Sequence, residues 1–168
     1  MTHPPPVLIP RLVPGPLWGQ GMRKDGRINW TKLSKQLRDL AGHRCEICGG
    51  SSEGAPTNWQ TCLDEVWAYE YENRTAYLID LKVICWWCNA IIHFGFTHST
   101  QTPATARRAL DHAAKLNGIP ANDMEAICIL HLHHHAEISK HTDWTQDWDD
   151  WEAVAAAARE RIQAARSA

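Results

Sequence analysis

The spacing of apolar residues divides the chain into a helical start, a central part rich in strands and a helical C-terminal part. Apolar residues recur at intervals of three and four over residues 30–41, which predicts an amphipathic helix ended by Gly42. Residues 59–69 and 75–78 are predicted to be strands joined by a polar turn, and residues 80–84 are expected to lead the chain back toward Cys85. The centre of the chain is therefore expected to contain a hairpin.

Helix-starting residues recur in the C-terminal part. Thr102 can cap a helix whose first residue is Pro103. Asn122, with Glu125 three residues later, resembles a capping box for the next helix. The alanine-rich residues 153–165 predict a last helix.

These elements predict one α+β domain over residues 29–168, with its core at residues 43–96 and a helical part at residues 102–166. A chain of 168 residues is long enough to bury such a core. Within the core, residues 89–94 are predicted to form a short helix that the following glycine ends. Residues 1–28 are rich in proline and glycine and lack a helical period, so they are expected to form an extended N-terminal arm on the surface of the domain.

Two CxxC units are the strongest chemical feature of the sequence. They consist of Cys45, Cys48, Cys85 and Cys88. Each unit places two thiolates on one tight turn, and four sulfurs complete the tetrahedral shell of a structural zinc site. Such a site is coordinatively closed, so it holds strands and helix together and performs no chemistry. The remaining cysteines, Cys62 and Cys128, are expected to be small buried apolar residues.

The composition restricts which cell compartment and which binding partners are expected. The N-terminus has no basic region followed by a long apolar run, and no stretch approaches the roughly 20 apolar residues of a membrane span. A cytoplasmic protein without a membrane partner is therefore expected, and a reducing compartment favours metal binding over disulfides at CxxC units. The net charge of −2 gives no overall attraction to nucleic acid. Any contact with DNA must come from local basic patches such as residues 23–27, which can equally be solvated surface.

The residues around the second CxxC unit follow a known pattern. Residues 80–93, DLKVICWWCNAIIH, keep the spacing of the core Asn-Leu-x-x-Leu-Cys-x-x-Cys-His-x-x-x-His found in many HNH nucleases. Residues 64–69, DEVWAY, match the His-Glu-x-Trp-x-Tyr segment of one subgroup, with Asp64 in place of the histidine. The chain therefore resembles the HNH endonuclease family over about residues 10–152. The resemblance implies a zinc-stapled ββα-metal core, the His-Me finger fold, with flanking helices, and hydrolysis of DNA phosphodiester bonds.

The resemblance also implies a role for each residue at a matching position. Asp64 would bind the catalytic metal, and Glu65 would stand in the place of the base that takes a proton from the attacking water. Asn89 and His93, one turn apart on a helix, would be the other metal ligands. Asp80 takes the place of an asparagine that braces the loop carrying the base. Two oxygens and one nitrogen favour Mg²⁺ or Mn²⁺ over zinc at this second site.

Two questions stay open from the sequence. A glutamate of ordinary pKa is a weak base at neutral pH; burial of Glu65 beside Trp59 and Trp67 would raise its pKa, and a nearby cation would lower it. The alternative to an endonuclease is a catalytically inactive zinc-binding module of the same fold that binds nucleic acid or a protein partner. A metallohydrolase of another class is a third possibility. The substituted positions all still carry ligands or proton acceptors, which favours the nuclease.

Two further groups of residues stand out near the C-terminus. His131 and His135 lie one helical turn apart, with His134 beside them. This spacing can bind a transition metal, form a polar helix face or approach DNA near His93. Three tryptophans recur at helical spacing and are predicted to pack on the core rather than to form a base-stacking platform. They are Trp144, Trp148 and Trp151.

Overall fold

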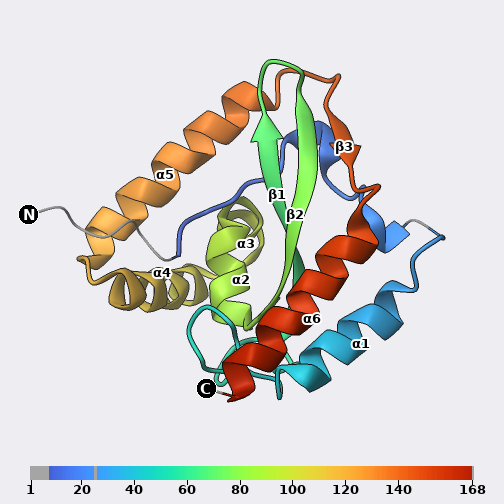
Figure 1. The fold of residues 1–168 in the computed structure, drawn as a ribbon. Helices are drawn as coiled ribbons and strands as arrows, with labels where there is room; N and C mark the ends of the chain where they lie inside the picture. The colour runs from blue at the N-terminus through green and yellow to red at the C-terminus, as the bar shows by residue number, and fades with distance from the viewer. Residues whose placement is uncertain (1–7, 25, 168) are drawn as a thin grey trace, which may run out of the picture.

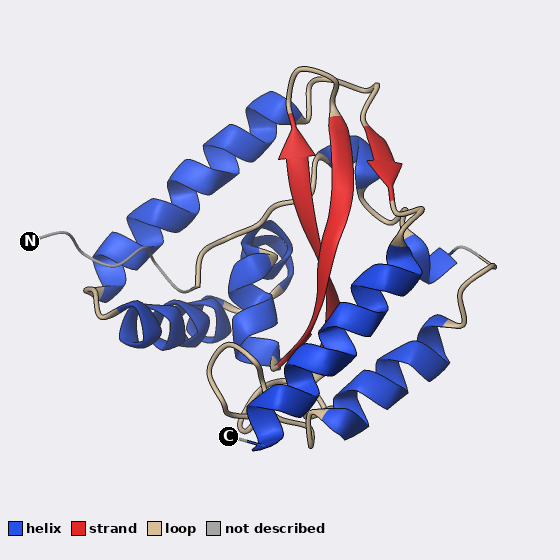
Figure 2. Ribbon diagram, in the orientation of Figure 1, coloured by secondary structure: helices blue, strands red, loops and turns tan. Residues whose placement is uncertain are grey.

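The computed structural model describes residues 8–24 and 26–167. These residues form a mixed α+β fold with six α-helices, two 3-10 helices and a three-stranded sheet, and Figure 2 shows helices on both sides of the strands. The α+β class predicted from the sequence is confirmed. Across the described ranges, no helix combines the length and the apolar character needed to cross a lipid bilayer.

A long hairpin forms the centre of the fold (Figure 1). Strand β1 (Cys62–Glu70) pairs antiparallel with β2 (Thr75–Ile84), and β3 (Thr145–Asp147) adds parallel to the first residues of β2. The pairing shifts by one residue after Val66, so Ile79 is an extra residue on β2 that does not interrupt the strand. The predicted hairpin is confirmed, whereas β3 comes from a polar stretch that carries no strand pattern in the sequence.

Helices α1 (Trp30–Leu40) and α6 (Trp151–Ser167) lie side by side against the hairpin (Figure 1). Leu37 of α1 and Ala158 of α6 are fully buried together with Leu81 of β2, in one of the two hydrophobic cores. Small alanine side chains let α6 approach the sheet closely. The apolar spacing that predicts the first helix therefore marks the face that packs on the sheet.

The chain leaves β2 directly into α2 (Trp86–Ile92), which is followed by α3 (Phe94–Thr100). The predicted short helix over residues 89–94, ended by Gly95, is wrong at both ends, because α2 begins earlier and the glycine lies inside α3. Gly95 therefore does not terminate a helix and lies in the first turn of α3, near α5. A Cβ at this position would lie 3.4 Å from a methyl group of Leu132 on the neighbouring helix.

Helices α4 (Pro103–Asn117) and α5 (Ala121–Ile138) complete the layer around α2. The predicted start of α4 is confirmed, since Thr102 Oγ1 accepts a hydrogen bond of 3.2 Å from the amide three residues later. The predicted capping box of α5 is wrong. The helix begins one residue before Asn122, with Pro120 as its N-cap and without a side-chain cap, so the asparagine falls inside the first turn.

Residues 8–18, here called the N-terminal strap, run across α4 and α5 toward the sheet (Figure 1). The side-chain amide of Asn117 holds both backbone groups of Leu8: Oδ1 accepts from the Leu8 amide at 2.9 Å, and Nδ2 donates to the Leu8 carbonyl at 2.7 Å. Further along, the hydroxyl of Ser139 accepts from the Gly15 amide at 2.8 Å. Side chains from distant helices thus fix the course of a segment with little regular structure of its own.

The N-terminal arm predicted over residues 1–28 differs from the observed segment in its burial. Residues 1–7 lie outside the described residues, and the rest contains η1 (Gly15–Leu17) and η2 (Met22–Lys24). Leu8, at the start of the strap, is only 1% exposed, and both short helices contribute a buried apolar side chain. The segment is therefore part of the core packing, because isolated apolar residues between prolines can be buried without a helical or strand period.

Candidate functional site

The four cysteines of the CxxC units meet where the loop after α1 passes the start of α2. Their sulfur atoms all lie within 4.8 Å of one another, and the Sγ atoms of Cys48 and Cys85 are 3.6 Å apart. The backbone of Glu46 fixes the first unit to β2, since its amide donates to the Val83 carbonyl at 2.8 Å. In return, the Glu46 carboxylate accepts from the Val83 amide at 2.7 Å.

These distances fit a tetrahedral metal site. All six cysteines of the chain are free thiols. Sulfurs bound to one zinc ion at about 2.3 Å are about 3.8 Å from one another in a tetrahedron, close to the 3.6 Å between Cys48 and Cys85. The cluster could therefore hold a metal ion such as zinc.

His112 adds a contact to this cluster that the sequence does not reveal. Its Nε2 atom, on α4, lies 3.4 Å from the Sγ of Cys88, where an N–H donor would stabilise a thiolate. A hydrogen bond from Cys45 holds the pKa of Cys48 below its usual range, whereas hydrogen bonds to Cys45 and Cys48 raise the pKa of Cys88.

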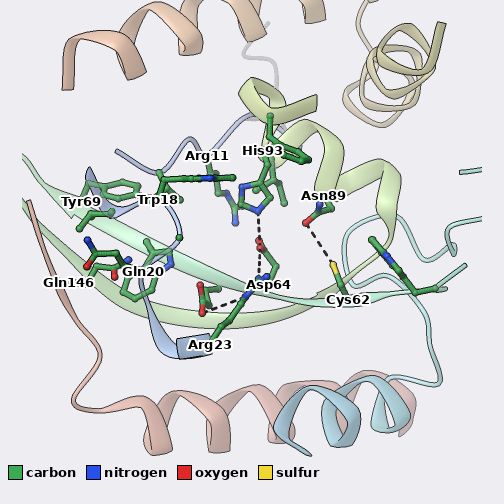
Figure 3. A pocket seen from close by; sticks show the side chains of 18 residues that line it. Arg11, Trp18, Gln20, Arg23, Cys62, Asp64, Tyr69, Asn89, His93 and Gln146 are labelled. Atoms are coloured by element: carbon green, nitrogen blue, oxygen red, sulfur yellow. Dashed lines mark hydrogen bonds and ion pairs between the residues drawn. The ribbon is translucent and has the colours of Figure 1, made fainter. Parts of the chain in front are cut away.

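A second site lies in a cavity of about 510 Å³ between the hairpin, α2 and the N-terminal strap (Figure 3). Asp64, Asn89 and His93 line it, together with Glu65. Strand β1 supplies the two carboxylates, and α2 with its C-terminal cap supplies the amide and the imidazole. The structure thus brings together the three predicted metal ligands and the predicted base.

Asp64 and His93 are in direct contact. The Nε2 atom of His93 is 3.0 Å from Oδ1 of Asp64. Asp64 is buried, with only 3% of its surface exposed. The His93 amide donates to the Asn89 carbonyl at 2.9 Å, so these two residues are one helical turn apart, as expected. The Asn89 side-chain oxygen accepts a long hydrogen bond of 3.7 Å from the Cys62 thiol. Cys62 is therefore a half-buried neighbour of the site and not only a packing residue, whereas Cys128 is fully buried as predicted.

The surroundings of Glu65 shift the pKa of its carboxyl away from that of an exposed glutamate. Burial raises the pKa of its carboxyl above the usual range, and the nearby Arg23 guanidinium partly opposes this effect. Arg23 places Nε 3.8 Å from Oε1 of Glu65 and NH2 3.9 Å from Oδ1 of Asp64. A raised pKa makes a glutamate a better proton acceptor near neutral pH.

The buried Glu65 carboxyl is expected to lower the stability of the protein at neutral pH. Below its usual pKa of 4.5, the folded and unfolded chains both hold the proton. As the pH rises through the folded-state pKa, the unfolded chain has already lost its proton, so the free energy of unfolding falls. Glu65→Gln, which is neutral at every pH, is expected to show a higher Tm than the parent at about pH 8, with the difference shrinking toward about pH 4.

The matched control is Glu72→Gln in the exposed hairpin turn, which is expected to leave Tm unchanged at both pH values. Thermal melting followed by circular dichroism provides the measurement. Equal Tm values for the parent and Glu65→Gln across this pH range would contradict a raised pKa.

Asp80 is not among the residues that line the cavity. Its Oδ1 accepts from the Leu81 amide at 2.8 Å and pairs with NH1 of Arg161 at 2.6 Å. The same arginine, on α6, binds the Glu46 carboxylate at 2.9 Å. The Asp80 side chain thus ties α6 to β2 and, through Arg161, to the first CxxC unit, and its carboxylate forms no hydrogen bond to β1 within the described residues.

The histidines of α5 bind the strap and the hairpin turn. His135 Nε2 is 2.9 Å from the Val13 carbonyl, and His134 Nε2 is 3.2 Å from the Tyr71 hydroxyl. Within residues 8–24 and 26–167, the cysteine cluster is the one group of three or more His, Cys, Asp or Glu side chains close enough to share an ion. The spacing of His131 and His135 by one helical turn therefore does not bring together a second group of metal-binding side chains in these ranges.

The C-terminal tryptophans pack as predicted. Trp144 is buried, and its Nε1 donates to the Ile138 carbonyl at 2.9 Å. Trp148 and Trp151 are half-buried against the same core. These rings consequently stabilise the contact between the sheet and the C-terminal segment.

No protein-family model, curated protein or solved structure matches this chain. The resemblance to HNH nucleases therefore rests on the residues and spacings described above.

Some cavity residues carry no motif that sequence reasoning could use. They are Arg11, Trp18, Phe96 and Gln146. They come from the strap, α3 and β3, which are far apart in the chain and meet only in the folded protein. An isolated arginine or aromatic residue in a loop has no period or spacing that distinguishes it from solvated surface.

Proposed function

We propose that this protein is a metal-dependent, HNH-like endonuclease that hydrolyses phosphodiester bonds of DNA. The observation that carries the proposal is the pairing of Asp64 on β1 with His93 at the end of α2, at 3.0 Å inside the cavity. The resemblance implies a site in which the first strand of the hairpin and the helix after the hairpin present ligands to each other. The proposal is supported further by the thiol cluster, whose last member, Cys88, directly precedes Asn89 in the chain.

The side chains of the cavity suit a hard cation such as Mg²⁺ or Mn²⁺. Asp64 and Asn89 offer oxygens, and His93 offers a ring nitrogen. Two buried atoms of cavity residues, Nδ1 of His93 and Oε1 of Glu65, lack a hydrogen-bond partner among the described residues and retain capacity for a ligand. When bound, the cation supplies positive charge that stabilises the scissile phosphate and the leaving oxygen.

Side chains of the protein would carry out the other parts of the reaction. Glu65 accepts a proton from the attacking water, a role that the raised pKa of this carboxyl supports. Arg23 lies within 3.9 Å of both carboxylates and is half exposed, so its guanidinium can turn to a phosphate oxygen. The cysteine cluster, holding zinc, would fix α2 to the hairpin and thereby set Asn89 and His93 against β1.

A catalytically inactive binding module is the second candidate function. Arg23 forms ion pairs with Asp64 and Glu65, and His93 contacts Asp64, so both carboxylates already have partners within the protein. The oxygen of Asn89 is engaged by Cys62. In this alternative the fold would bind nucleic acid or a protein partner and leave it intact.

Cleavage of supercoiled plasmid DNA by the purified protein tests the proposal. Parent protein is compared in Mg²⁺, in Mn²⁺ and in EDTA, beside Glu65→Ala and, as a matched control, Glu72→Ala in the exposed hairpin turn. Cleavage that needs Mg²⁺ or Mn²⁺ and falls about 100- to 10,000-fold in Glu65→Ala is expected, because a positioned base contributes that much. Circular dichroism of the EDTA sample is needed, since a chelator can also remove zinc and unfold the protein.

The outcomes separate the two candidates. Equal cleavage by the parent and Glu65→Ala would show that a residue other than Glu65 acts as the base. Absence of cleavage of plasmid and of single-stranded DNA, by folded and zinc-loaded protein with every metal, would favour the binding module.

A further inference from the structure

Two aromatic side chains at the cavity have much of their surface in solvent. Trp18, in the strap, is 55% exposed, and Phe96, on α3, is 53% exposed. Their rings are stacked, with centroids 6.1 Å apart and planes inclined by 28°. Paired aromatic rings that stay exposed beside a cavity indicate a surface for a flat ligand.

This aromatic pair adjoins the proposed catalytic residues. The ring of Trp18 contacts the ring of His93 edge-on, with centroids 6.2 Å apart. The amide of Arg11 donates to the Ile92 carbonyl at 2.9 Å, which fixes Arg11 beside the end of α2. Figure 3 shows Arg11, Trp18 and His93 along the same side of the cavity. A ligand stacked on the rings therefore lies next to the Asp64–His93 pair.

Arg11 brings a cationic side chain to this side of the cavity. Arg23 is already engaged with Asp64 and Glu65. In contrast, the Arg11 guanidinium forms no ion pair or hydrogen bond within residues 8–24 and 26–167, although it lines the cavity. Guanidinium groups bind phosphate oxygens through two parallel hydrogen bonds. A phosphate placed next to His93 would therefore meet an arginine that has no competing carboxylate in the described part of the chain.

Amide groups occupy the other end of the cavity. Gln146, on β3, lines it, and Figure 3 shows this side chain next to Gln20. The side-chain amide nitrogen of Gln20 donates to the Pro16 carbonyl at 3.0 Å, whereas the side-chain amide of Gln146 forms no hydrogen bond in the part of the chain that the structure describes. An amide can donate and accept at once, which suits the edge of a nucleobase.

We propose that the cavity receives an unpaired nucleotide, so that single-stranded nucleic acid is the substrate class of this site. The base stacks on Trp18 and Phe96, and Arg11 holds the adjacent phosphate. In a duplex, neighbouring base pairs cover the faces of each base, and the two exposed rings would have nothing to stack on. The inference rests on the proposed function for the cleavage step, whereas binding is tested independently of cleavage.

Fluorescence polarisation with labelled oligonucleotides of about 12 nucleotides tests the inference, since single-strand sites span roughly 4–16 nucleotides. One sequence is supplied as single-stranded DNA, as single-stranded RNA and as a DNA duplex, at one fixed salt concentration and with Ca²⁺ in place of Mg²⁺. Either single strand is expected to bind at least about tenfold more tightly than the duplex. Cleavage of the same strands in Mg²⁺ is measured separately.

The variant Trp18→Ala is expected to weaken single-strand binding roughly 5- to 100-fold, and Trp18→Phe should restore most of it, because any aromatic ring can stack on a base. Leu130→Ala is the matched control, since this side chain is 68% exposed on α5 and does not line the cavity. It should bind like the parent. A folding defect is excluded by comparing the Tm values of all variants.

Each result bears on the inference in a defined way. Equal affinity for duplex and single strands, unchanged in Trp18→Ala, would overturn it, and cleavage that still depends on His93 would then leave the endonuclease proposal standing. Trp18-dependent binding of single strands without cleavage in any metal would support the inference and reject the endonuclease. No binding of any oligonucleotide would overturn the inference.

Discussion

Replacing Cys85 with serine is expected to leave the protein largely unfolded at room temperature. Cys85 supplies one of the four clustered sulfurs and is the N-cap of α2, which carries Asn89 and leads to His93. A structural zinc site contributes about 10–16 kcal/mol to folding, and a whole domain is stable by about 5–15 kcal/mol. Loss of one of four ligands therefore removes much of the free energy that favours the folded chain.

Circular dichroism and the zinc content of the purified variant provide the measurement. Cys62→Ser is the control, because Cys62 is a half-buried cysteine outside the cluster. That variant is expected to keep its zinc and to remain folded. A Cys85→Ser protein that melts like the parent would show that the thiol cluster holds no structural metal.

The second large effect is expected from His93→Ala, which should lower DNA cleavage by at least about 100-fold while the protein stays folded. Replacing even a hydrogen-bond partner of a metal ligand costs about 10- to 100-fold in activity, so loss of a ligand should cost more. His93 lies at the junction of α2 and α3 with 19% of its side chain exposed, and its Nε2 pairs with Asp64. Because the substitution to alanine changes only the side chain, both helices are expected to keep their backbone conformation.

Asp64→Asn tests the same point without removing atoms, because asparagine keeps the shape and loses the charge. It should lose cleavage to a similar extent. His133→Ala, at an exposed position of α5, is the matched histidine control and should cleave like the parent. If His93→Ala cleaves at the parental rate with an unchanged Tm, the Asp64–His93 pair has no part in the reaction.

Sequence rules predicted the elements well where the signal is local. Thr102 caps α4 as its type and position predict, and the apolar spacing of residues 30–41 marks the buried face of α1. The same rules fail where a distant contact decides. Gly95 has the appearance of a helix stop, but it lies inside α3, where Leu132 of α5 is its neighbour. β3 forms because β2 offers an open edge to residues 145–147, not because of their β-propensity.

The residues of the candidate site likewise fall into those that a local spacing predicts and those that a distant contact positions. Asp64, Glu65, Asn89 and His93 could be predicted because a fixed spacing on one hairpin and one helix places them together. Asp80 occupies a matching position in the sequence, yet Arg161, 81 residues later, directs its carboxylate to α6. Nothing in the local sequence around either residue predicts that pairing.

The strap leaves the ribosome long before the side chains that hold it. Asn117, His135 and Ser139 follow their partners in the strap by 109, 122 and 124 positions. The four clustered cysteines, in contrast, have all been translated once residue 88 is made. A nascent chain can therefore assemble its cysteine core early, while the strap gains its bonds to Asn117, His135 and Ser139 only after α4 and α5 have emerged. During synthesis, the strap is therefore made early, but the side chains that hold its two ends are made late.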